Sequence, residues 1–321
     1  MKAIAVVAAV LGLAAAVPAC AAGYPDKPIK MLVGFLPGGG TDVTARLLAT
    51  RLSEKLGQSV IVENRPGAGG MIATAAVARS APDGYTMLMA SAADAAQHLM
   101  HKDLSYDLLK DFAPVSLVVT VPFALAIKPT LPVENVAQLV ELARAHPGEL
   151  RYASSGMGSA AHLSNELFNT MAKARIVHIP YKGVAEGVTA VASNQIDMVF
   201  ASFPSVMSLA AAKKVKLLAV STPYRTAVMP ELPTVAESGL PGYARYGWYG
   251  VVMPKNVPPE VVDRMNAAIV AVVSAPDVKQ AFIKQGLEPK TTTREEFAGF
   301  LKDEVEQATE LARASGLEAA R

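Results

Sequence analysis

The sequence lacks several features that define whole classes of protein. Its only cysteine is Cys20, which excludes an internal disulfide framework and a thiolate metal cluster. It has no basic run or stripe, and 30 Lys and Arg residues against 28 Asp and Glu residues give a net charge of only +2. This balance excludes the electrostatic footprint of a nucleic-acid-binding protein. Beyond residue 22 no uninterrupted apolar run reaches the roughly 18 residues of a membrane-spanning helix.

Apolar sequence, by contrast, is abundant. Hydrophobic residues make up 51% of the 321 residues, and no low-complexity tract interrupts them, which excludes intrinsic disorder. At about 100–200 residues per domain, a chain of this length predicts two domains that each bury a core.

The first 22 residues form a predicted export signal. Lys2 provides a positive start, Ala3–Val17 forms an apolar stretch, and the small residues of Ala19–Ala22 follow it. A transmembrane anchor is the alternative, but the stretch is shorter than the roughly 20 apolar residues that a span needs. The segment around Cys20 also loosely resembles a lipoprotein cleavage box, into which Pro18 fits poorly, so lipid anchoring stays an alternative. In either case we expect an exported, periplasmic protein.

The chain after residue 22 alternates short apolar strands with amphipathic helices. Such alternation predicts an α/β fold with mainly parallel sheets that are covered by helices. In the first part of the chain the predicted elements are the strand Ile29–Phe35, the helix Thr41–Leu56, the strand Ser59–Glu63, the helix Met71–Ser80 and the strand Tyr85–Ala90.

The same alternation restarts after Pro122, which indicates a second lobe. Its predicted elements are the strand Phe123–Ile127, the helix Val133–Ala145, the strand Arg151–Ser154, the helix Ser159–Met171, and the strands Ile176–Ile179, Met198–Ala201 and Lys216–Ser221.

Two amphipathic helices, Glu260–Ser274 and Arg294–Ser315, close the chain. We expect the chain to cross between the lobes near Val119–Phe123 and again near Gly247–Val252. The predicted domains are therefore residues 23–122 with 247–321 for lobe 1, and residues 123–246 for lobe 2.

A glycine triplet separates the first predicted strand from the first helix. Gly38, Gly39 and Gly40 precede Thr41 and Asp42. A helix start with unhindered backbone amides favours an anion, because free N–H groups and the positive end of the helix dipole meet there. The motif is neither a P-loop nor a dinucleotide fingerprint, since the required spacing fails. The alternative is a tight turn in which Thr41 caps the helix.

The second half of the chain repeats this pattern. Ser154, Ser155 and Gly156 follow a predicted strand, and Ser159 begins the next helix. The serine hydroxyls either cap the helix or donate to a ligand carboxylate, and the sequence leaves both roles open. Because open α/β sheets bind ligands at the carboxyl ends of their strands, the two loops predict a binding cleft between the lobes.

No catalytic or metal-binding motif is complete. G-x-S-x-G and H-E-x-x-H are absent, so we expect no metal site and no cofactor. One enzymatic alternative stays open: a secreted serine hydrolase in which His162 serves as the base for Ser155 or Ser159.

A set of motifs in a fixed order then points to a family. These motifs are Tyr24–Ile29, Pro37–Asp42, Glu63–Gly70, Pro82–Thr86, Tyr152–Gly156, His178–Gly183, Leu232–Gly239 and Trp248–Gly250. Together they resemble the substrate-binding proteins of tripartite tricarboxylate transporters, the extracytoplasmic Bug receptors, over essentially the whole chain after the signal. Two departures are Leu36, where the family usually has a smaller residue, and residues 184–186, which replace a run of small residues.

The resemblance implies a two-lobed periplasmic-binding-protein fold of type II, a clamshell, and a non-enzymatic receptor for a small organic carboxylate. It implies a monomer that delivers its ligand to membrane transporter subunits or to a sensor, and service in signalling alone is the alternative. Carried over by position, the ligand-binding residues are Gly38, Gly39, Gly40, Thr41, Asp42, Ser154, Ser155, Gly156 and Ser159, with Ser91 and Ser202 as weaker additions.

Overall fold

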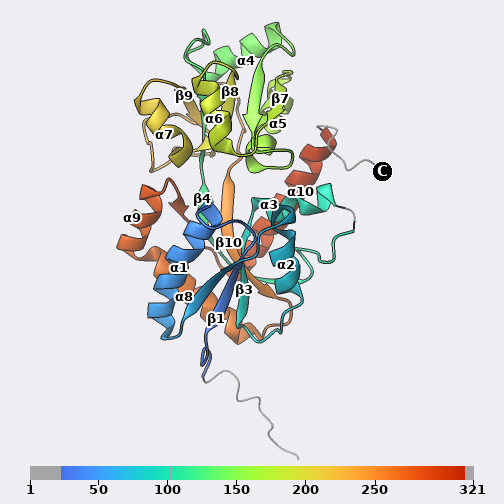
Figure 1. Ribbon diagram of the computed structural model, residues 1–321, viewed down its shortest axis with the longest axis vertical. Helices are drawn as coiled ribbons and strands as arrows, with labels where there is room; N and C mark the ends of the chain where they lie inside the picture. The colour runs from blue at the N-terminus through green and yellow to red at the C-terminus, as the bar shows by residue number, and fades with distance from the viewer. Residues whose placement is uncertain (1–22, 102, 315–321) are drawn as a thin grey trace, which may run out of the picture.

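The computed structural model describes residues 23–101 and 103–314, whose strands form two separate sheets (Figure 1). The predicted export signal and Cys20 lie outside the described residues. Within the described ranges, no helix combines the length and the apolar character that crossing a membrane requires.

The first sheet has six strands in the order β11-β4-β10-β3-β1-β2. Its strands are β1 (Ile29–Val33), β2 (Val60–Asn64), β3 (Thr86–Ser91), β4 (Phe112–Val121), β10 (Gly247–Pro254) and β11 (Glu288–Pro289).

The second sheet has five strands in the order β7-β6-β8-β5-β9. Its strands are β5 (Phe123–Ile127), β6 (Arg151–Ser154), β7 (Val177–Pro180), β8 (Met198–Ser202) and β9 (Lys216–Val220). Only Pro122 separates β4 of the first sheet from β5 of the second, so the chain changes sheet where the sequence predicted a crossing.

Both sheets are mixed, which corrects the expectation of mainly parallel sheets. β1 runs parallel to β2 and β3, and β6 runs parallel to β7 and β8. The pairs that involve β4, β5 or β10 are antiparallel. The cause is the crossing itself, because β4 leaves the first sheet on the same side on which β10 enters it, so the two strands run in opposite directions.

Helices cover both faces of each sheet. They are α1 (Gly40–Leu56), α2 (Met71–Ala78), α3 (Ala92–Met100), α4 (Val136–Ala145), α5 (Ala160–Ala172), α6 (Val184–Ala192), α7 (Phe203–Ala211), α8 (Pro259–Ser274), α9 (Pro276–Lys284) and α10 (Arg294–Ala314), with a 3-10 turn, η2, at Ala68–Gly70. In the core of the first sheet, α1 and α8 pack on one face, and α2, α3 and α10 pack on the other. Each half is thus a three-layer α/β/α unit.

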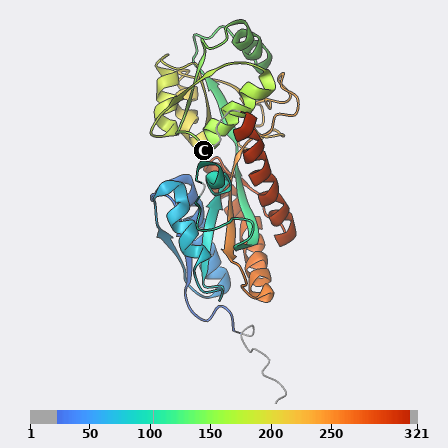
Figure 2. The same ribbon diagram turned by 90° about the vertical axis from the view of Figure 1, so that its right-hand side faces the viewer.

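Helix α10 connects the two halves on one side of the molecule (Figure 2). Leu311 near its end packs with Leu163 of α5, which belongs to the second sheet's layer, and with Ala96 of α3. Lower on the same helix, the Glu304 carboxylate accepts hydrogen bonds from Arg245 and from the indole N–H of Trp248, at the start of β10. A buried ion pair therefore ties the returning strand to α10.

Candidate functional site

The loop after β1 lies at the edge of the first sheet that faces the second. β4 leaves the first sheet at Val121 and β10 returns to it at Gly247, so these ends mark that edge. β3 is antiparallel to β10, with Ser91 opposite Tyr249, and β1 is parallel to β3. The carboxyl end of β1 and the glycine triplet that follows it in the chain therefore lie at the edge that faces the second sheet.

The loop after β6 occupies the matching position in the second sheet. β5 begins at Phe123, next to the crossing, and pairs antiparallel with β8, so that Phe123 is opposite Ser202. Because β6 is parallel to β8, the segment Ser154–Ser159 also lies at the edge that faces the other sheet. The two loops that the sequence singled out are thus brought to facing edges, as ligand binding at strand carboxyl ends requires.

The first loop leaves the start of α1 open. The helix begins at Gly40 with Gly39 as N-cap and no side-chain cap, so Thr41 is not the capping residue. Within the described chain, the backbone N–H groups of Gly40, Thr41 and Asp42 meet no acceptor. Three amides at the positive end of a 17-residue helix are therefore available to an anion.

Asp42 shapes this loop with its carboxylate. The side chain is buried and accepts hydrogen bonds from the Gly38 N–H at 2.9 Å, from Arg46 Nε at 3.0 Å and from Asn64 Nδ2 at 2.8 Å. Burial raises the pKa of Asp42, but these hydrogen bonds outweigh it and hold the pKa below its ordinary value. The Asp42 carboxylate therefore stabilises the loop, and the Arg46 side chain is occupied by its hydrogen bonds to Asp42 and Asn64.

Tyr249, on the crossing strand β10, packs closely against the same helix start. A Cβ atom at Gly40 would lie 2.6 Å from the Tyr249 hydroxyl, so only glycine fits there without a shift. Burial raises the pKa of Tyr249, and a hydrogen bond with Thr41 partly offsets this effect. Sequence analysis treated Tyr249 only as part of a motif and a crossing strand. Strand order, which places β10 beside β3, is what brings it to the site.

The second loop is held by its own hydroxyl groups. Ser159 is the N-cap of α5: its side chain accepts the His162 N–H at 3.2 Å and donates to the Gly156 carbonyl at 2.7 Å. The buried Ser154 hydroxyl accepts the Gly156 N–H at 3.0 Å. These two serines therefore stabilise the turn, which is the capping alternative that the sequence left open.

Two histidine rings support this loop from behind. His178 Nε2 lies 2.6 Å from the Ser154 hydroxyl, and the His162 Nδ1 accepts the Gly158 N–H at 3.2 Å. The two ring centroids are 4.4 Å apart, and Tyr152 stacks on His178 at 4.9 Å. Burial is the main cause that lowers the pKa of both imidazoles, for His162 to about 4. The sequence marked His178 only as the start of a family motif, because its contact with Ser154 depends on the register between β6 and β7.

Among the described residues, neither Ser155 nor Ser159 is hydrogen-bonded to the His162 ring, as the hydrolase alternative would require. The His162 ring accepts a backbone N–H, and the Ser159 hydroxyl donates to a carbonyl. Ser154 does contact an imidazole, that of His178, but its side chain is fully buried and offers no open nucleophile. Among the residues the structure describes, no group of three or more His, Cys, Asp or Glu side chains is arranged to hold a metal ion.

The outer part of the second loop is open. Ser155 and Met157 are exposed, and a Cβ atom at Gly156 would meet nothing within 4 Å. Gly38 in the first loop has the same open space around it. These positions can meet a ligand without any rearrangement of the core.

The two weaker candidates have different surroundings. The buried Ser91 hydroxyl donates to Asp94 at 2.9 Å within a capping box at the start of α3. The half-buried Ser202 lies at the start of α7, 3.1 Å from the Ser205 hydroxyl, and provides no side-chain cap to the helix. The Ser91 side chain therefore stabilises the start of α3, whereas the start of α7 beside Ser202 has no side-chain cap.

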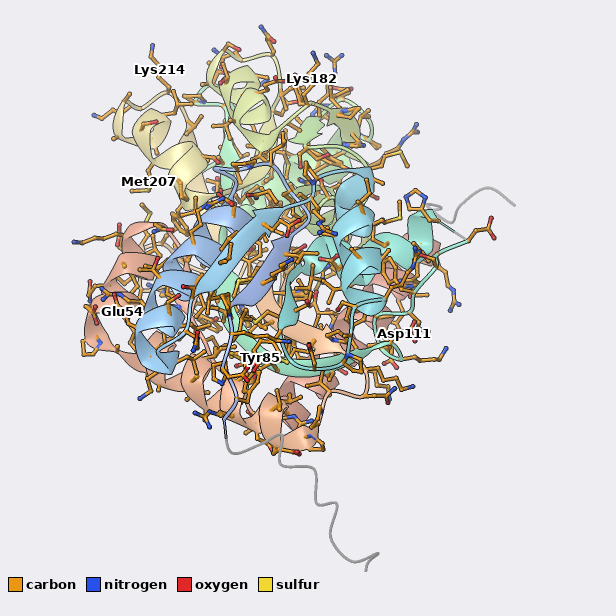
Figure 3. All side chains as sticks on the ribbon, turned by 60° about the horizontal axis from the view of Figure 1, so that its bottom comes forward. Glu54, Tyr85, Asp111, Lys182, Met207 and Lys214 are labelled. Atoms are coloured by element: carbon orange, nitrogen blue, oxygen red, sulfur yellow. The ribbon has the colours of Figure 1, made fainter. Side chains whose placement is uncertain are left out.

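The cations near the two loops differ in how free they are to meet an anion. Arg65 pairs with Glu63 at 2.7 Å, and Arg46 is bound to Asp42. Lys182, labelled in Figure 3, is exposed, and it follows Pro180 of β7, which pairs with Ser154, so it lies at the same sheet edge as the second loop. An anion held between the loops would therefore meet mainly amides and hydroxyls, with Lys182 as a cation near the second loop.

Comparisons with known proteins show which family and fold this chain shares. A family model described as the tripartite tricarboxylate transporter family receptor matches residues 44–317. BugT of Bordetella pertussis is 37% identical over 310 residues, which cover 96% of this chain and 94% of BugT. Rpa4515 of R. palustris, solved with adipate, has a TM-score of 0.80 at 34% identity and covers 92% of this chain and 100% of its own.

Two further solved structures support the same assignment. MatC from Rhodopseudomonas palustris with bound malate has a TM-score of 0.74 at 27% identity, over 90% of this chain and 99% of MatC. The periplasmic binding protein BugD has a TM-score of 0.76 at 32% identity, over 92% of this chain and 100% of BugD. The predicted family and the two-lobed α/β fold are confirmed. This chain belongs to the tripartite tricarboxylate transporter receptor family of periplasmic solute-binding proteins.

Proposed function

We propose that the protein is an extracytoplasmic receptor that captures a small organic carboxylate between its two lobes and presents it to a membrane transporter. The observation that carries this proposal is the pair of helix starts at facing sheet edges, one of which offers three unmet backbone amides. Relatives solved with adipate and malate support a carboxylate as the ligand.

The proposed lobes are residues 23–122 with 247–321, and residues 123–246. The change of sheet at Pro122 and at the start of β10 supports this division. Ligand that bridges both loops would favour the closed arrangement by its greater affinity for that state. The first 22 residues are proposed to be the export signal that brings the chain to the periplasm.

The proposed site divides its residues by role. The amides of Gly40, Thr41 and Asp42 and the exposed Ser155 would contact the ligand, together with the open backbone at Gly38, Gly39 and Gly156. Ser202 would add a hydroxyl at the start of α7. Asp42, Ser91, Ser154 and Ser159 would act by holding the loops, because their side chains are already hydrogen-bonded within them.

A sensor partner in place of a transporter would use the same ligand site. Co-purification of the protein with transporter membrane subunits or with a membrane sensor distinguishes these partners. The proposal includes a monomer that works without a cofactor.

A thermal-shift screen of small carboxylates tests the proposed ligand class. A ligand at 100 times its dissociation constant stabilises the native state by about 2.7 kcal/mol, so a binding acid raises the melting temperature by several degrees. Matched amides of the same acids, which lack the negative charge, serve as controls. Stabilisation by neutral sugars alone would contradict a carboxylate receptor.

A further inference from the structure

The buried imidazole of His162 makes a hydrogen bond that only one of its protonation states permits. His162 lies in the first turn of α5, and its side chain is almost completely buried. Its Nδ1 atom is 3.2 Å from the backbone nitrogen of Gly158. A backbone N–H can only donate, so Nδ1 must be an unprotonated acceptor and the ring proton must reside on Nε2.

The Gly158 N–H makes no other hydrogen bond within the described part of the chain. It has a φ of +74°, a conformation that side chains rarely adopt, and it links the exposed part of the loop to the N-cap Ser159. The His162 acceptor therefore fixes the orientation of the peptide that connects Met157 to the start of α5.

Taken together, the groups around the His162 ring disfavour its protonated, positively charged form. His178 on β7 is in ring contact at 4.4 Å, so two imidazolium ions would repel each other. Tyr152 on β6 lies 6.3 Å away, and its hydroxyl donates to the Glu166 carboxylate, one turn further along α5. The negative charge of Glu166 acts in the opposite direction to burial and to His178, because it favours the protonated ring.

We propose that His162 is a positioning residue whose neutral imidazole holds the Ser154–Ser159 loop in its ligand-binding shape, and that acidification releases the loop. Protonation at Nδ1 replaces an acceptor by a donor, so the Gly158 N–H loses its partner and faces a cation. His178 differs in this respect, because its Nε2 can either accept from or donate to the Ser154 hydroxyl. The role in ligand binding rests on the proposed function, whereas the hydrogen bond itself does not.

Amide hydrogen exchange on the ligand-free protein tests the hydrogen bond. Asn at position 162 keeps an acceptor close to the place of Nδ1, and Leu removes it, so we compare His162→Asn with His162→Leu. At pH 7 we expect the Gly158 amide to keep its protection in His162→Asn and to lose about tenfold in His162→Leu. His146→Asn, at an exposed histidine, is the control and leaves the protection unchanged.

A pH titration of the same amide tests the release. As the pH falls from 7 to 4, protection of Gly158 decreases in the wild type and stays constant in His162→Asn. Wild-type protection in a folded His162→Leu variant would overturn the proposal. If that variant does not fold, the ¹⁵N spectrum of the wild-type ring decides, because a proton on Nδ1 at pH 7 excludes the hydrogen bond.

Calorimetry with adipate and malate then tests the effect on the ligand. We expect His162→Leu to weaken binding about tenfold, and His162→Asn to bind as the wild type does without its weakening at low pH. Equal affinities in all three proteins would overturn the positioning role. A wild-type protein that binds neither acid contradicts the proposed function for these ligands, while the exchange experiment still decides the hydrogen bond.

Discussion

The two loops at the facing sheet edges share a sequence pattern but are built on different chemistry. In the first, the charged Asp42 carboxylate gathers Gly38, Arg46 and Asn64, and the helix start is left uncapped. In the second, neutral groups hold the turn: the Ser159 hydroxyl caps the helix, and the buried His162 ring accepts an amide. The same strand–glycine–helix pattern therefore leaves the start of α1 without a side-chain cap and gives the start of α5 one.

Because of this difference, the two loops contribute differently to the proposed site. An uncapped helix start can bind an anion, because its first N–H groups have no hydrogen-bond partner within the helix. A capped start contributes mainly shape, together with the exposed Ser155 hydroxyl. The first loop is also held by a group that stays charged to low pH, and the second by rings that stay neutral only above moderately acidic pH.

Removal of the Asp42 carboxylate should give the largest change. In Asp42→Ala the buried carboxylate is removed and three donors lose the acceptor that they share, so we expect the free energy of unfolding to fall by about 3 kcal/mol. Chemical denaturation measures this loss. Glu54→Ala, at an exposed carboxylate on the same helix, labelled in Figure 3, should cost less than about 0.5 kcal/mol. Similar losses in both variants would mean that the first loop does not depend on its buried acid.

A side chain at Gly40 should mainly affect binding. In Gly40→Ala the Cβ atom meets the Tyr249 hydroxyl at 2.6 Å, so the helix start or the tyrosine must move. We expect affinity for the carboxylate found by the screen to fall about 100-fold, or about 2.8 kcal/mol. The double variant Gly40→Ala/Tyr249→Phe removes the hydroxyl and should recover part of the loss in calorimetry. Unchanged affinity in Gly40→Ala would show that ligand does not use this helix start.

Acid should weaken the second loop before the first. The pKa of His162 is lowered to about 4, so the unfolded chain takes up the proton first as the pH falls. Its contribution to stability is complete above pH 6.5 and is lost toward pH 4. Between pH 6.5 and 5 the free energy of unfolding should fall by about 2 kcal/mol on its account.

Denaturation curves across this pH range check the expectation, with His162→Asn as the comparison. The variant should lose most of the slope, and the remainder belongs to His178, whose pKa is also lowered. Asp42 behaves differently, because a carboxyl group with a lowered pKa keeps its contribution until the pH falls below its ordinary value of 3.8. An identical slope in the wild type and in His162→Asn would contradict the assignment.

The order of elements was largely predictable from the sequence. Periodicity and glycine breaks gave Arg151–Ser154 as a strand, and they placed the helix that is α1 within one residue of its observed start. Sequence analysis missed α3, α6, α7 and α9. Each of these helices has only nine residues, and one begins with Phe203-Pro204 directly after a strand, so no long periodic pattern marks them.

The site was predictable as a pair of loops but not as a set of contacts. The open helix start at Gly40 follows from local sequence, because glycine before a helix supplies no side-chain cap. The contacts of Ser154 with His178 and of Gly40 with Tyr249 depend on strand order and register. Local pattern carries no information on either, so both residues entered the site only through the fold.

The smallest expected effects separate the two serines of the second loop. In Ser159→Ala the helix loses its cap, and we expect the free energy of unfolding to fall by about 1 kcal/mol. In Ser155→Ala no described partner is lost, so stability should stay within about 0.5 kcal/mol of the wild type. Melting curves and ligand calorimetry on the same samples distinguish a serine that stabilises the loop from one that contacts the ligand. If Ser155 touches the carboxylate, affinity falls without a change in stability, whereas a variant that changes neither would leave ligand recognition in this loop to its backbone alone.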